Sequence, residues 1–118
     1  MARVVALLPD LLFGSNVQGA LAAAGHDVQL VAGQEAARAA LPGAEVLVLD
    51  LAADADGGLA ALDALRATDA LEGVRVLAAY AHVETETKAR AEAAGVDLAV
   101  PRSRMAREGA ALVERLLA

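Results

Sequence analysis

Two carboxylates stand where short apolar runs of the sequence end. Asp50 closes the run "AEVLVLD", and an acidic, glycine-bearing segment, "LAADADGG", follows at once. Asp10 follows the first apolar run, "RVVALL", after a single proline. A carboxylate presented at the end of a strand can be a reactive group or bind a divalent metal. It can equally accept hydrogen bonds from loop N–H groups, so both interpretations of Asp50 stay open. Asp10 has the same choice between a metal ligand and an N-cap, and we favour the cap because Asp is among the best N-cap residues.

Arg102 is the cation that follows the last apolar run, and Ser103 comes next. A guanidinium there can bind an anion or pair with Asp50. An ion pair between Arg102 and Asp50 would hold the site in one state without phosphate, and we state it as a hypothesis. The serines, histidines and aspartates form no recognisable triad, and no G-x-S-x-G motif occurs. We therefore expect no enzyme.

The composition excludes several classes of protein. The 118 residues suit one domain, and 58% hydrophobic with 22% charged residues excludes disorder. Cysteine is absent, which excludes disulfide and thiolate chemistry, and two histidines are too few for a His-rich metal site. A net charge of −6 argues against binding nucleic acid. No apolar run reaches the ~20 residues that span a bilayer, and the start does not suit a signal peptide. We expect a soluble, cytoplasmic protein that does not bind a membrane.

Apolar runs alternate with segments of helical spacing along the whole chain. The runs predicted as strands are 3–8, 27–32, 45–51, 74–80 and 97–101, and Gly25 and Gly95 stand where helix C-cap glycines belong. This β-α order, repeated five times, predicts an α/β fold: a flavodoxin-like, doubly wound parallel sheet in a single domain, residues 1–118. The expected strand order is 2-1-3-4-5. In such sheets, sites lie beyond the carboxyl ends of the strands, at the switch point between the first and third, where Asp10 and Asp50 both belong.

At this point the chain resembles the receiver domain of bacterial response regulators, and the resemblance covers essentially its whole length. The best local match is "DLAADADGGLAALDALR" (50–66), in which Asp50 falls on the family's phosphoacceptor and Gly58 on its loop glycine. The others are "LAAYAH" (77–82) and "AGVDLAVPRS" (94–103). The resemblance implies the receiver fold and a signalling role.

The departures from the family pattern all fall on the residues that assist the phosphoacceptor. The acidic pair that would bind Mg²⁺ falls on Leu8 and Pro9, which offer no side-chain ligand. The short hydroxyl residue falls on Tyr80 or Ala81. The family's lysine falls on Arg102, with Ser103 where proline is usual. The site-lining residues are thus Asp10, Tyr80, Ala81, Arg102 and Ser103, and the chain resembles a divergent, stand-alone pseudo-receiver.

The resemblance leads to one principal prediction and two alternatives. We expect a signalling module that binds a protein partner or a second copy of itself, without cofactor and without dependence on phosphate. The expected surface is formed by the fourth helix, fifth strand and fifth helix and carries Tyr80, His82, Glu84, Lys88, Arg102, Arg104 and Arg107. For Tyr80, a partner-binding anchor and a half-buried packing residue stay open. One alternative is a working receiver, phosphorylated on Asp50 by a histidine kinase, with Mg²⁺ held by Asp10 and Asp50. The other is a small-ligand domain that uses the same crevice.

Overall fold

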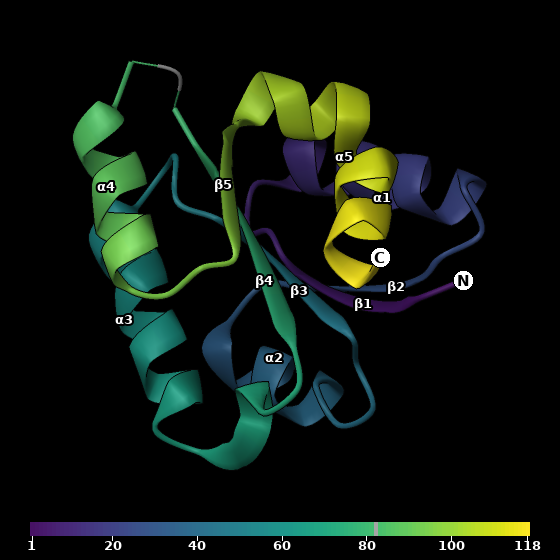
Figure 1. Ribbon diagram of the computed structural model, residues 1–118, viewed down its shortest axis with the longest axis horizontal. Coiled ribbons are helices and arrows are strands. Elements are labelled where there is room, and N and C mark those ends of the chain that lie inside the picture. The colour runs from purple at the N-terminus through teal and green to yellow at the C-terminus, as the bar shows by residue number, and fades with distance from the viewer. Residues whose placement is uncertain (82) are drawn as a thin grey trace.

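The fold is a parallel sheet covered by helices on both faces. The computed structural model describes residues 1–81 and 83–118. Five strands pair in parallel in the order β2-β1-β3-β4-β5, as Figure 1 shows. They are β1 (Arg3–Leu7), β2 (Asp27–Val31), β3 (Val46–Asp50), β4 (Arg75–Tyr80) and β5 (Leu98–Pro101). The predicted fold class, strand order and strand positions are confirmed.

Helices connect the strands and cover both faces of the sheet, which divides the core in two. They are α1 (Leu11–Ala23), α2 (Gln34–Ala40), α3 (Ala55–Arg66), α4 (Thr85–Ala93) and α5 (Arg102–Leu117), with a short 3₁₀ helix, η1 (Asp69–Leu71), that the sequence did not predict. Helices α1 and α5 cover one face of the sheet, and α2, α3 and α4 cover the other (Figure 1). In the described part of the chain, no helix is both long enough and apolar enough to cross a bilayer.

Burial explains the sequence pattern of the strands. Every residue of β3 is buried, because the strand is central and covered by helices on both faces. Strand β2 lies at an edge, and its residues alternate between exposed and partly buried up to Val31, which is buried. Gly25 ends the turn after α1 at φ +93°, a left-handed conformation that a side chain disfavours, so its predicted role at the helix end is confirmed.

Three details define where helices α1, α3 and α5 begin. Leu12, in the first turn of α1, is 75% exposed, because the inward face of this helix starts at Gly14. Helix α3 starts at Ala55, because Asp54 caps it by accepting from the N–H of Gly57 (2.9 Å). Helix α5 starts directly at Arg102, since Pro101 is both the last residue of β5 and the N-cap.

Close packing of α1 on the end of β1 depends on Gly14. A Cβ added there would lie 3.0 Å from the backbone oxygen of Leu8 and 3.3 Å from its Cβ. Leu8 is itself buried, so neither neighbour can move freely. A Cβ at Gly19, in the same helix, would meet nothing within 4 Å. Packing therefore explains the first glycine and not the second.

These two glycines predict opposite effects of the same substitution. Gly14→Ala should lower the free energy of unfolding by about 1–3 kcal/mol, because it overpacks the contact between α1 and Leu8. Gly19→Ala should raise it by roughly 0.5–1 kcal/mol, because alanine favours the helix at an open position. Urea denaturation of both variants is the measurement, and equal stabilisation by both would contradict the packing.

Candidate functional site

The site lies at the carboxyl ends of the central strands, where Asp50 ends β3. Its side chain is 2% exposed. Strand β4 pairs with β3 so that Ala79 faces Asp50, and Pro101 of β5 faces Tyr80 in the next pair. Helix α5 starts directly after Pro101, so its first residue, Arg102, lies beside these strand ends.

The guanidinium of Arg102 binds both carboxylates that the sequence analysis singled out. Its Nε donates to both carboxylate oxygens of Asp50, at 3.3 Å and 3.1 Å. Its Nη2 donates to Oδ2 of Asp50 at 2.5 Å and to Oδ2 of Asp10 at 3.1 Å. A planar guanidinium suits such a fork, which a compact ammonium could not reproduce in the same way. The hypothesis of an Arg102–Asp50 ion pair is confirmed, and Asp10 is part of it.

Asp50 receives one more hydrogen bond from the loop that follows it. The N–H of Ala52 donates to Oδ1 at 2.9 Å. The carboxylate thus accepts from the backbone and from a cation on a different segment. A buried carboxylate needs such partners, because desolvation of an unpaired charge is strongly unfavourable.

Asp10 caps α1 and holds Arg102 at the same time. Its Oδ1 accepts from the N–H of Phe13 at 3.1 Å, which confirms the N-cap interpretation. This backbone hydrogen bond, then the one from Arg102, lowers the pKa of Asp10 below its ordinary value. On the other side of the pair, the hydrogen bond to Asp50 raises the pKa of the Arg102 guanidinium.

Phe13 is a part of the site that sequence reasoning missed. The Cζ of Arg102 lies 4.4 Å from the centroid of its ring, within the range of a cation–π contact. One sequence signal was available: Phe13 lies three residues after the N-cap Asp10, in the first turn of α1. The ring thus covers the guanidinium while the carboxylates hold its N–H groups.

The residues present do not fit the Mg²⁺ site that the resemblance implied. Leu8 is 2% exposed and packs into the core shared by α1 and α5, so it contributes nothing to the site. Asp10 and Asp50 both bind a guanidinium that already supplies a positive charge. Residues 1–81 and 83–118 contain no group of three or more His, Cys, Asp or Glu side chains able to hold a metal ion. Magnesium binds through one or two carboxylates and several waters, and the carboxylate oxygens of this pair are already bound by Arg102 and by backbone N–H groups.

The remaining predicted site residues are not brought into the cluster. Tyr80 is 7% exposed and belongs to the core on the α2–α4 side, so of its two alternatives burial contradicts the surface anchor and favours the packing residue. Its place in an internal strand, directly facing Pro101, is the reason. Ala81 is half-buried and carries no hydroxyl, and Ser103 is exposed on α5. His82 lies outside the described residues.

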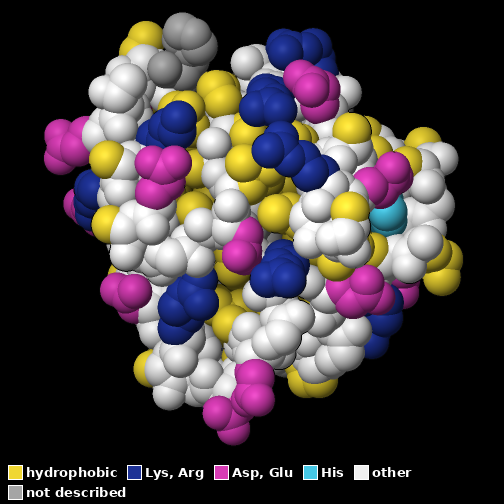
Figure 2. Space-filling view, viewed as in Figure 1, with side chains coloured by type: hydrophobic (Ala, Val, Ile, Leu, Met, Phe, Trp, Pro, Cys, Tyr) yellow, Lys and Arg dark blue, Asp and Glu magenta, His cyan; other side chains and the backbone are white. Residues whose placement is uncertain are grey.

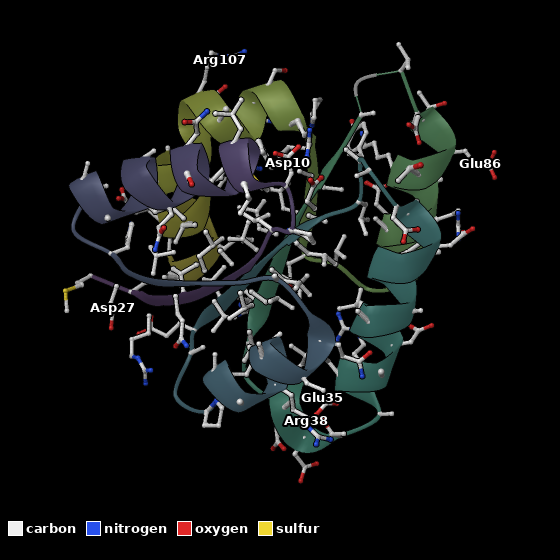
Figure 3. All side chains as sticks on the ribbon, turned by 180° about the vertical axis from the view of Figure 1, so that it is seen from behind. Asp10, Asp27, Glu35, Arg38, Glu86 and Arg107 are labelled. Atoms are coloured by element: carbon white, nitrogen blue, oxygen red, sulfur yellow. The ribbon has the colours of Figure 1, made fainter. Side chains whose placement is uncertain are left out.

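The predicted interaction surface keeps four of its charged members. Glu84 and Arg107 are exposed, and Lys88 and Arg104 are half-buried. Arg104 and Arg107 both pair with Glu108, at 3.6 Å and 3.3 Å. Figure 3 shows Arg107 pointing away from the body of the protein on α5. Arg102, in contrast, is committed to the ion pair.

Solved structures of response regulators share this architecture. The receiver domain of the Francisella response regulator 1452 matches with a TM-score of 0.82 at 19% identity, over 98% of this chain and 96% of that one. The Vibrio cholerae chemotaxis protein CheY4 matches with a TM-score of 0.83 at 20% identity, over 98% of each chain. The chain has the receiver-domain fold. The phosphorylated cyanobacterial phytochrome response regulator RcpA has this receiver fold too, with a TM-score of 0.79 at 16% identity, over 99% of this chain and 94% of that one. No family model and no curated protein matches the sequence.

The lowered pKa of Asp10 predicts how acid affects stability. A carboxyl group whose pKa falls on folding stabilises the protein above its ordinary pKa of 3.8, and this contribution is lost as pH falls through the lowered value. Asp10→Asn keeps a good N-cap and removes the charge. Wild type should therefore be more stable than Asp10→Asn at neutral pH, and the difference should disappear in strong acid. Urea denaturation from pH 7 down to about pH 2 measures it, and a difference that stays constant over this range would contradict the assignment.

Proposed function

We propose that the chain is a receiver-like signalling module that acts by binding a protein partner, or a second copy of itself, without phosphorylation. The observation that carries the proposal is the guanidinium of Arg102 bound to both Asp50 and Asp10. In this account a permanent cation from α5 holds the site in one state.

The contacts of Asp50 argue against phosphoryl transfer. Both of its oxygens accept hydrogen bonds from Arg102, and Oδ1 also accepts from Ala52. Phosphoryl transfer relies on positioning and on metal ions that offset the charge of the incoming group. Leu8 is buried in the core and Pro9 has no side-chain ligand, so nothing replaces the missing acidic pair. An attacking Asp50 would also have to give up its ion pair.

The surface formed by α4, β5 and α5 supports recognition of a protein. Strand β5 is an edge strand of four residues, and its Leu98 and Pro101 are only partly buried. Figure 2 shows apolar side chains between α4 and α5, bordered by Lys and Arg. A partly apolar centre with a charged rim is typical of protein interfaces.

A working receiver is the second candidate, and one observation favours it. Asp50 ends the central strand of the receiver fold and has a cation beside it, as the resemblance to the family implies for its phosphoacceptor. RcpA shows that a protein of this fold exists in a phosphorylated form. In this second candidate function, Arg102 would give up its hydrogen bond to Asp10 and neutralise the phosphoryl group.

Treatment with a small phosphodonor separates the two candidates. The protein is incubated with acetyl phosphate and Mg²⁺, and its intact mass is measured at intervals, with Asp50→Asn as the control for the site. The proposal predicts no adduct on Asp50, because its oxygens are engaged and the metal ligands are absent. A phosphoryl adduct on the wild type that Asp50→Asn abolishes would establish the working receiver.

A second arm of this experiment tests the interaction surface. Arg104→Glu with Arg107→Glu reverses charge on α5, and Arg38→Glu is a matched control on α2, since Arg38 pairs with Glu35 in a similar exposed ion pair (3.5 Å). Self-association is measured by sedimentation, and capture of partners by the immobilised protein from extracts of its source cells. The α5 variant should lose association and the α2 variant should keep it. Equal behaviour of the two variants would refute this surface.

A further inference from the structure

A pocket of about 360 Å³ opens beside Asp50 on the side away from α5. Its walls come from the ends of β1 and β3 and from the loops that lead into α2 and α3. This is the switch point of the sheet, where open α/β folds bind ligands. Arg102 and Phe13 are not among its lining residues, so the pocket lies next to the ion pair and not within it.

Small residues leave this space open. The loops contribute Ala32, Gly33 and Ala53, and the first turns of α3 contribute Gly57 and Gly58. A Cβ at either of these two α3 glycines would displace a neighbouring side chain, that of Asp54 at Gly57 and that of Leu51 at Gly58. Ala32, Gly33 and Ala53 have no side chain long enough to fill the pocket. Its volume falls within the range of small-molecule sites.

The walls combine an apolar surface with excess negative charge. Leu7, Pro9 and Leu49 contribute apolar walls. Three carboxylates also line the pocket, those of Asp10, Asp50 and Asp54, and the described lining contains no Lys or Arg. Arg102, behind the wall, offsets one of these charges. A net negative charge remains, which disfavours phosphates and other anions and favours a cation.

We propose that this pocket binds a small organic cation, a molecule with an apolar body and one protonated amine. The apolar body would occupy the space between β1, β3 and α3. The ammonium would lie near Asp54, the exposed carboxylate of the lining. This inference goes beyond the proposed function and stands whether or not Asp50 accepts phosphate. Such a ligand would give the module an input other than phosphorylation, directly beside the ion pair.

Three probes of similar size and different charge test the ligand class. They are 2-phenylethylamine, 2-phenylethanol and phenylacetate, titrated into ¹⁵N-labelled protein and followed by amide chemical shifts. The amine should give saturable shifts at Gly33, Gly57 and Gly58, with millimolar affinity as befits so small a molecule. It should bind at least about threefold more tightly than the alcohol, and phenylacetate should not bind. Absence of saturable shifts, or binding of the alcohol or the acid as tightly as the amine, would overturn the proposal.

Matched variants test the location and the charge. Asp54→Asn keeps an N-cap for α3 and should weaken the amine about threefold or more, with no effect on the alcohol. Asp63→Asn removes the same charge from an exposed position of α3 outside the pocket and should change neither. Ala61→Leu fills the pocket and should weaken both ligands at least about tenfold. If its spectrum shows misfolding, Gly33→Leu serves instead, since a Cβ there meets nothing within 4 Å. Unchanged amine binding in a folded, filled variant, or an equal loss in both asparagine variants, would refute the site.

Discussion

A single guanidinium connects three parts of the chain that are far apart in sequence. Arg102, the first residue of α5, binds Asp50 at the end of β3 and Asp10 at the start of α1. Asp50 is almost fully buried, so its charge is tolerated only while a cation and a backbone N–H remain bound to it. The start of α5 is therefore fixed relative to the central strand.

Under the proposed function, this constraint gives the receiver fold a use other than phosphoryl transfer. The resemblance to response regulators places Asp50 on the phosphoacceptor position, and Leu8 and Pro9 on the positions of the acidic pair. Leu8 packs under α1, where Gly14 allows close approach, so its apolar side chain serves the core. The pocket on the other side of Asp50 is the site where we propose that a small organic cation binds. A ligand there would lie beside the carboxylates that hold Arg102.

The sequence predicted the fold well because its strands are buried on both faces or end at clear turn signals. Asp10 as a cap and Arg102 as the partner of Asp50 also followed from residue types at strand ends. For Tyr80 the sequence left two alternatives, because its place at a strand end does not show that the core on the α2–α4 side buries it. The contact of Phe13 with Arg102 and the size and lining of the pocket depend on how α1, α2 and α3 approach the sheet, which residue types and spacing do not specify.

The most direct test of the central claim measures how much Arg102→Met changes the free energy of unfolding in two backgrounds. In the wild type this substitution leaves the Asp50 charge buried without its cation and should lower the free energy of unfolding by about 3 kcal/mol. In an Asp50→Asn background the buried charge is gone, and the same substitution should lower it by less than about 1 kcal/mol. Equal losses in both backgrounds would show that Arg102 and Asp50 are not energetically coupled and would contradict the account.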